Sequence, residues 1–196
     1  MAAKQPVKIG GQTPGSTLSD FPEVLKAALN LPIQVVGGYK GTADIRLAAD
    51  SGEVDGGCWG WETIKVTWRK GIELGDVKVV IQAVPKKHPE LQDVPNAVDL
   101  AKSDEARQLI KAGIIDPATI VRSYSLPPGT PKERVKILRD AFMATMKDPE
   151  FLAETKKSEL EVNPMSGDEV QSIVQGFFKL QPSVVAKLKE VMLPKK

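Results

Sequence analysis

The residues best suited to chemistry lie in the first loop of the chain. A short apolar segment at 7–9 runs into residues 10–17 (GGQTPGST), and an amphipathic helix pattern follows. A loop rich in glycine and hydroxyl groups before a helix offers free backbone N–H groups and the positive end of the helix dipole. This arrangement binds phosphate, sulfate or carboxylate. The expected donors are the N–H groups of Gly15, Ser16 and Thr17 and the hydroxyls of Thr13, Ser16 and Thr17.

The same loop also suits a plain strand-to-helix turn, because glycine and serine fit any tight turn. Its spacing resembles a nucleotide phosphate loop, but no lysine precedes Ser16. Nucleotide hydrolysis is therefore not expected. Anion binding and a structural turn both remain open interpretations of residues 10–17.

A second turn follows at residues 38–42 (GYKGT). The backbone of Gly41 and Thr42 is expected to open another helix that faces the same edge of the sheet, with Tyr39 and Lys40 beside it. The alternative is a turn whose lysine is simply solvated.

A third turn holds two of the three tryptophans. Trp59, Gly60 and Trp61 follow the third predicted strand at 54–58. Aromatic side chains on such a loop bury organic ligands well, although tryptophan is more often part of a core. Both interpretations stay open, with these three residues as ligand-binding candidates.

The remaining reactive side chains do not form a catalytic set. Glu53 and Asp55 share one face of a strand, which would allow acid–base work, but a structural role is the favoured interpretation. Cys58 lacks a nearby base, and the single histidine, His88, lies in a polar loop. No nucleophilic triad or metal-ligand spacing is present. We expect a protein that is not an enzyme and needs no cofactor.

Hydrophobic periodicity predicts an α/β fold. The expected strands are 7–11, 33–36, 54–58 and 77–84, and the expected helices are 19–30, 42–51, 62–69 and 97–113. Strands that alternate with helices indicate right-handed crossovers and a mostly parallel sheet. A loop is expected at 85–95 and an extended crossing segment at 120–126.

The C-terminal third is predicted to be purely helical. Capping boxes are expected at 130–133 (TPKE) and 166–169 (SGDE), and further helices at 148 and 182. Each helix carries an apolar stripe that must be buried. We therefore expect a lobe at 1–123, a crossover with helices of another lobe at 124–196, and possible homodimer contacts through 130–192.

The overall composition and net charge limit the kinds of partner that we expect. The chain has 196 residues, 41% hydrophobic and 27% charged, with a formal net charge of +2. These values indicate a globular protein and give no electrostatic reason for binding nucleic acid. No apolar stretch approaches the roughly 18 residues of a membrane span.

Five motifs, in order, resemble those of the substrate-binding proteins of tripartite tricarboxylate transporters, the Bug-type periplasmic receptors. The motifs are residues 13–16 (TPGS), 39–41 (YKG), 52–55 (GEVD), 93–95 (DVP) and 127–131 (PPGTP). Two departures are Gly38, where the family has proline, and the paired tryptophans, where it has smaller or polar residues.

The resemblance implies a periplasmic-binding-protein-like lobe and helices that return to a second, incomplete lobe. It further implies a small organic carboxylate as ligand, membrane permease subunits as partners and a periplasmic location. Because family members carry a signal peptide and half a lobe before the strand at 7–11, it implies an N-terminally shortened chain. The alternatives are a small α/β enzyme that acts on a phosphorylated substrate through residues 10–17, and an interaction module that pairs through its helices.

Overall fold

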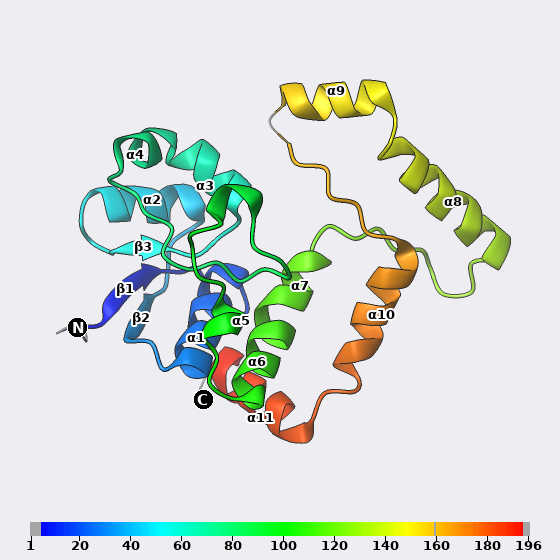
Figure 1. The fold of residues 1–196 in the computed structure, drawn as a ribbon. Coiled ribbons are helices and arrows are strands. Elements are labelled where there is room, and N and C mark those ends of the chain that lie inside the picture. Colours follow the sequence, from blue (N-terminus) through cyan, green and yellow to red (C-terminus); the bar gives the residue numbers. More distant parts are fainter. Residues whose placement is uncertain (1–4, 159, 194–196) are drawn as a thin grey trace. The chain divides into compact units, whose positions relative to one another are not determined.

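The computed structural model describes residues 5–158 and 160–193 (Figure 1). The chain has an α/β fold with a small parallel sheet and many helices. It separates into two compact units. Unit 1 comprises residues 1–118 and 180–196, and unit 2 comprises residues 119–179.

The sheet of unit 1 has three strands in the order β2-β1-β3. They are β1 (Val7–Gly10), β2 (Ile33–Val36) and β3 (Gly56–Gly57). Both pairings are parallel, with Gly10 opposite Val36 on one side and Gly57 on the other. The predicted parallel sheet is confirmed for these three strands, and their carboxyl ends meet at one edge.

Two helices link the strands of the sheet. α1 (Thr17–Leu29) joins β1 to β2 and ends at Asn30, whose φ of 52° is the left-handed conformation typical of a helix C-terminus. α2 (Thr42–Asp50) joins β2 to β3. The short helices α3 (Trp61–Thr67) and α4 (Arg69–Leu74) follow β3, and the sequence analysis missed the second of them.

The core of unit 1 lies beside α1. That helix packs against α6 (Asp104–Ile110), a π-helical turn η2 (Lys111–Ile115) and α11 (Pro182–Met192), which lie together in Figure 1. The cluster is completed by α5 (Ala97–Leu100). Its most deeply buried members are Val24, Ala97 and Ile110.

Residues 77–84 do not form the fourth strand that their valines and isoleucines predicted. They make a single parallel bridge, between Gln82 and Asn96, and Val80 is 73% exposed. The edge strand β3 consists of two glycines, which hold a strand poorly and leave little length for a further strand to pair with. The segment instead carries Gln82, whose side-chain amide donates to Leu91 O and Val94 O. This buried glutamine organises the 85–95 loop, which contains the 3₁₀ turn η1 (Pro89–Leu91).

The helix predicted at 97–113 is interrupted. The chain leaves the helical path after α5, and Ser103 caps α6 by accepting a hydrogen bond from the Ala106 N–H. A serine at a helix N-cap favours a new start over continuation. After η2, α7 (Asp116–Thr119) closes this run, and the predicted extended segment at 120–126 opens with a turn.

Unit 2 contains α8 (Lys132–Thr145), α9 (Pro149–Lys157) and α10 (Gly167–Phe177). The capping box at Ser166 is confirmed, since its hydroxyl accepts from the Glu169 N–H while the Glu169 carboxylate accepts from Ser166. The one predicted at Thr130 is wrong. Its hydroxyl donates to Pro127 O, and Pro131 occupies the N-cap.

The two compact units differ from the division expected at residue 124. α11 packs against α1 and α6, so the last helix belongs with unit 1 and not with the other C-terminal helices. Its residue Val184 is buried, and Leu188 lies close to Gly113 of η2. The predicted fold class, α/β, does not depend on where α11 packs.

We expect Ile110→Ala to lower the free energy of unfolding by about 2–5 kcal/mol, because the side chain is fully buried and its loss leaves a cavity. Urea denaturation followed by circular dichroism measures this change. Leu74→Ala is the control: Leu74 is 76% exposed, so its truncation should cost about 0.5 kcal/mol or less. Equal effects of the two substitutions would contradict the described core.

Candidate functional site

The first two loops at the carboxyl edge of the sheet are tied together by their backbones. The Gly38 N–H donates to Gln12 O at 3.1 Å, and the Tyr39 N–H donates to Gly11 O at 3.2 Å. The Gln12 side-chain amide donates to Lys40 O at 2.6 Å. The loops therefore hold each other in place, as a preorganised binding edge requires.

Two buried hydroxyl groups without hydrogen-bond partners lie at the start of α1, one on its N-cap and one in its first turn. Ser16 is the N-cap of α1, yet its side chain makes no capping bond, and Ser19 is only 7% exposed. Both Oγ atoms are buried and unpaired. Because buried polar groups are nearly always satisfied, a water molecule or a ligand is needed to complete the hydrogen bonding of these two hydroxyls.

Some of the predicted donors in this loop are already used. The Gly15 N–H donates to the Asp20 carboxylate at 3.0 Å, and the Ser16 N–H donates to Thr13 O at 3.2 Å. Thr13 and Thr17 are exposed. The N–H of Thr17 lies in the first turn of α1, where a helix supplies no acceptor of its own.

Asp20 is a residue of the candidate site that the sequence analysis missed. Its carboxyl group is buried in the first turn of α1, and this burial raises its pKa, partly offset by the hydrogen bond from Gly15. The group places a negative charge where an external anion would bind. An acidic residue in the first helical turn was the available signal.

The second loop is held by carboxylates of its own. The Lys40 N–H donates to Asp44 at 3.2 Å, and the Tyr39 hydroxyl donates to Glu53 at 2.7 Å. The bond to Glu53 raises the pKa of Tyr39. Lys40 is exposed, whereas Gly41 and Thr42 are half-buried at the N-terminus of α2.

Trp59, the first tryptophan of the third loop, packs against other residues of the chain. Trp59 stacks on Trp68 with ring centroids 5.0 Å apart, and it lies over Gly57, where an added Cβ would be 1.9 Å from the indole Cζ3. Trp68 in turn donates to Asp50 at 2.9 Å. The buried Nε1 of Trp59 has no hydrogen-bond partner, so this indole retains one unused donor.

Trp61 is engaged with the 85–95 loop. Its Nε1 donates to Glu90 at 2.6 Å, and Lys65 forms an ion pair with the same carboxylate at 2.9 Å. These two bonds, the one from Lys65 first, lower the pKa of Glu90. The His88 ring lies edge-on to the Trp61 indole, with ring centroids 6.4 Å apart. Gly60 is exposed and precedes α3 as its N-cap.

The described residues provide neither an ionised thiol at neutral pH nor a cluster of metal ligands. Burial raises the pKa of the Cys58 thiol to about 11, which keeps it protonated at neutral pH. Within residues 5–158 and 160–193, no group of His, Cys, Asp and Glu side chains is arranged to hold a metal ion. In the same ranges, no helix has the length and apolar character needed to cross a membrane.

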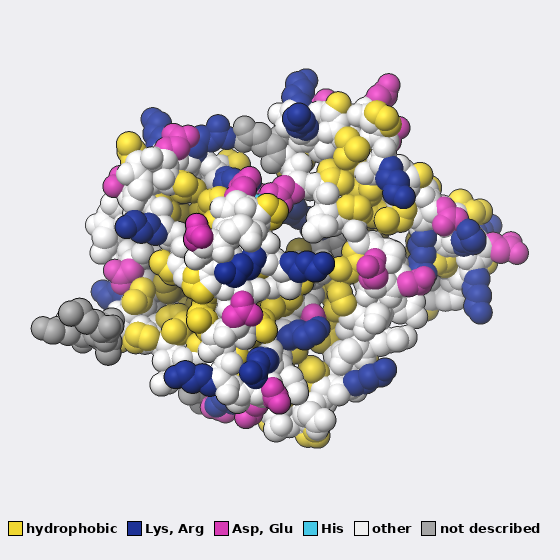
Figure 2. All heavy atoms as spheres, viewed as in Figure 1, with side chains coloured by type: hydrophobic (Ala, Val, Ile, Leu, Met, Phe, Trp, Pro, Cys, Tyr) yellow, Lys and Arg dark blue, Asp and Glu magenta, His cyan; other side chains and the backbone are white. Residues whose placement is uncertain are grey.

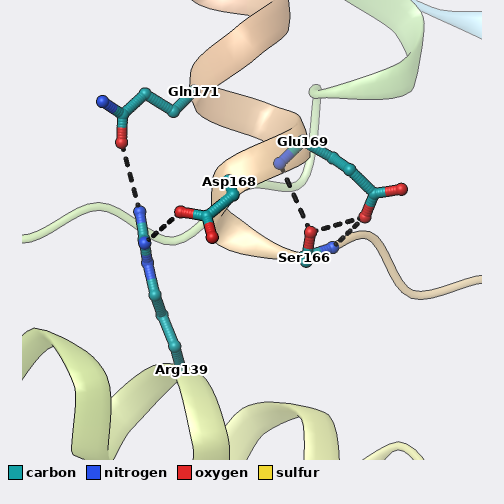
Figure 3. Close-up of polar contacts among 5 residues, drawn as sticks. All are labelled: Arg139, Ser166, Asp168, Glu169 and Gln171. Atoms are coloured by element: carbon teal, nitrogen blue, oxygen red, sulfur yellow. Dashed lines mark hydrogen bonds and ion pairs between the residues drawn. The ribbon is translucent and has the colours of Figure 1, made fainter.

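Unit 2 contains an open groove that the sequence analysis did not identify. Arg139 of α8 reaches across it to Asp168 at 2.6 Å and Gln171 at 3.4 Å, beside the capping box of α10 (Figure 3). An added Cβ at Gly167 would lie 2.3 Å from Arg139 Nε, so the glycine permits this crossing. The groove encloses about 580 Å³ and is lined by Lys132, Val135, Lys136, Arg139, Asp140, Met143, Ser166, Gly167, Asp168 and Gln171.

Comparison with protein-family models, with curated proteins and with solved structures gives no match for this chain.

We expect Gly57→Ala to displace Trp59 and break its stack on Trp68, because the new methyl group would overlap the indole. Near-ultraviolet circular dichroism and tryptophan fluorescence report this change. Gly56→Ala is the matched control, since an added Cβ at Gly56 meets nothing within 4 Å. An unchanged aromatic spectrum in Gly57→Ala would contradict the described packing.

We expect Asp20→Asn to gain thermal stability over the parent protein as pH rises. A raised folded-state pKa means that stability is fully present below the unfolded value of 3.8 and is lost as pH rises through the folded value. Asparagine keeps an oxygen for Gly15 without a buried charge. Melting temperatures measured from pH 4 to 7 test this, with Asp44→Asn as the control at the start of α2. If the melting temperature of Asp20→Asn falls relative to that of the parent protein as pH rises, the prediction is contradicted.

Proposed function

We propose that this chain is a solute-binding lobe for a small organic carboxylate, of the type found in tripartite tricarboxylate transporter receptors. The observation that carries the proposal is the pair of buried, unpartnered hydroxyls of Ser16 and Ser19 at the start of α1. A carboxylate accepts hydrogen bonds only, so it complements donors that the chain leaves unused.

The helix adds to this site. α1 is thirteen residues long, and its N-terminus carries a partial positive charge equivalent to roughly half an elementary charge. The ligand would be held by the hydroxyls of Ser16 and Ser19 and by the Thr17 N–H. The unused N–H of Trp59, in the loop after β3 at the same edge of the sheet, is a further donor.

Local charge favours a carboxylate over a phosphate. Residues 10–17 contain no lysine or arginine, and Asp20 already uses the Gly15 N–H. A dianionic phosphate would meet stronger repulsion from Asp20 than a singly charged carboxylate group does. Lys40, which is exposed in the adjacent loop, is a candidate for the counter-charge.

The proposed role is binding without chemistry. In receptors of this type a bound ligand shifts the population toward a closed form, which membrane permease subunits would then recognise. A periplasmic location and a two-lobed closure are parts of the same proposal, and they rest on the sequence motifs.

A thermal-shift screen tests the proposal with mono-, di- and tricarboxylates, aromatic acids, sulfate, phosphate esters and nucleotides. A ligand at about 100 times its dissociation constant stabilises the protein by about 2.7 kcal/mol, which is readily seen. We expect a shift with carboxylates and a loss of affinity of about tenfold to a hundredfold in Ser16→Ala, because a hydrogen bond to a charged group contributes about 1.5–3 kcal/mol.

Ser172→Ala, an exposed serine of α10, is the matched control and should bind normally. A shift with phosphate esters alone would favour the alternative of a small α/β enzyme. The absence of any shift in the folded protein would count against a carboxylate site at α1.

A further inference from the structure

The first turn of α1 places a buried carboxyl group beside the hydroxyls of the candidate site. The Asp20 N–H donates to Ser16 O at 2.8 Å, and side chains four residues apart on a helix have Cβ atoms about 5–6 Å apart. The Asp20 carboxylate accepts from the Gly15 N–H at 3.0 Å. The Ser19 hydroxyl faces the same loop, because an added Cβ at Gly11 would lie 2.7 Å from its Oγ. A carboxylate held by these hydroxyls would therefore lie close to Asp20.

A second negative charge at this place favours a proton on Asp20. The side chain is in a residue that is only 7% exposed, so water screens its charge poorly. Burial already raises the pKa of this carboxyl group, and the hydrogen bond from Gly15 offsets only part of the rise. A like charge within about 4–6 Å raises the pKa of a carboxyl group further. Binding of an anion and protonation of Asp20 therefore favour each other.

In the part of the chain that the structure describes, no cation neutralises Asp20 instead of a proton. The raised pKa of Asp20 has burial and the Gly15 bond as its causes, and no neighbouring charge contributes. Residues 10–17 contain no lysine or arginine. Ion pairs on α1 and on the helices packed against it join other side chains: Glu23 with Lys26, Arg107 with Asp104, Lys111 with Asp116, and Lys187 with Glu190.

The charge of the whole protein does not set the charge of the ligand. The formal net charge is +2, and basic and acidic side chains lie interspersed on the face shown in Figure 2. A mixed face of this kind has no large field of one sign that would attract a multiply charged anion. The groups next to the ligand therefore decide, and Asp20 is the one charged residue within residues 10–20.

A proton also changes what Asp20 offers to a ligand. Its Oδ1 accepts from Gly15, while Oδ2 has no hydrogen-bond partner among the described residues and is free to take the proton. A carboxylate only accepts hydrogen bonds, whereas a protonated carboxyl group donates one, and an O–H···O⁻ bond is short and strong. We propose, on the basis of the proposed function, that Asp20 takes up one proton from solvent when a singly charged carboxylate binds, so that ligand and proton enter the site together.

Isothermal titration calorimetry of the full chain tests this with pyruvate and benzoate between pH 5.5 and 7.5, in two buffers of different ionisation enthalpy. Both acids are ionised in this range, so the protein supplies the titrating group. We expect up to one proton taken up per ligand bound, seen as a heat that depends on the buffer. The affinity should fall as pH rises, by up to about tenfold per pH unit, because the ligand binds best when Asp20 is already protonated.

Asp20→Asn is the decisive variant, because asparagine keeps an oxygen for the Gly15 N–H and does not titrate. It should bind both acids without proton uptake and with an affinity that no longer depends on pH. Asp44→Asn, at the start of α2, is the matched control and should keep the proton uptake of the parent protein. Ser16→Ala should weaken binding about tenfold to a hundredfold and keep the proton uptake per ligand bound.

The results distinguish failure of the proton coupling from failure of the binding site. Binding that Ser16→Ala weakens but that involves no proton uptake overturns the role of Asp20 and leaves the carboxylate site standing. Undiminished proton uptake in Asp20→Asn overturns that role as well. If no carboxylate binds, or if Ser16→Ala leaves the affinity unchanged, the proposed function fails and the coupling fails with it.

Discussion

The face that α1 shares with α6 and η2 is the contact on which the rest of unit 1 depends. Val24 and Ile110 are buried there almost completely. Gly113 allows the π-helical turn to approach Val24 so closely that an added Cβ would lie 3.1 Å from its Cγ1. The position of α1 in turn sets its N-terminus, the loop before it and the start of the sheet. Dispersion and hydrophobic burial far from the sheet edge thereby position the polar groups at that edge.

At the candidate site, the positive end of α1 and the negative charge of the Asp20 carboxylate have opposite effects on an anion. α1 offers a positive end and two hydroxyls, while Asp20 supplies an opposing charge that is poorly solvated. Under the proposed function, this arrangement would favour singly charged anions, and protonation of Asp20 would affect their binding. The second loop uses Asp44 and Glu53 in a comparable way, to fix its own backbone and Tyr39. Both loops are therefore stabilised by carboxylates that belong to the chain.

Local patterns predicted much of this fold, and contacts distant in sequence account for what they missed. The strands at Val7 and Ile33 and the capping box at Ser166 follow from residue type and spacing within a few positions. The segment at 77–84 looked like a strand, but its behaviour depends on Gln82 reaching the carbonyl groups of Leu91 and Val94. For the site, sequence placed the three loops at one edge. It could not show that Trp61 is committed to Glu90, twenty-nine positions away.

The return of α11 to unit 1 has a consequence for how the protein is made. Unit 2 is inserted between α7 and α11, and the core beside α1 is closed only when the final helix arrives. During synthesis, α1 emerges from the ribosome early and waits for a partner encoded more than 150 positions later. Long-range closure of this kind is slow, and the waiting surface is prone to association. The surface of α1 that α11 covers therefore stays exposed until α11 has been synthesised.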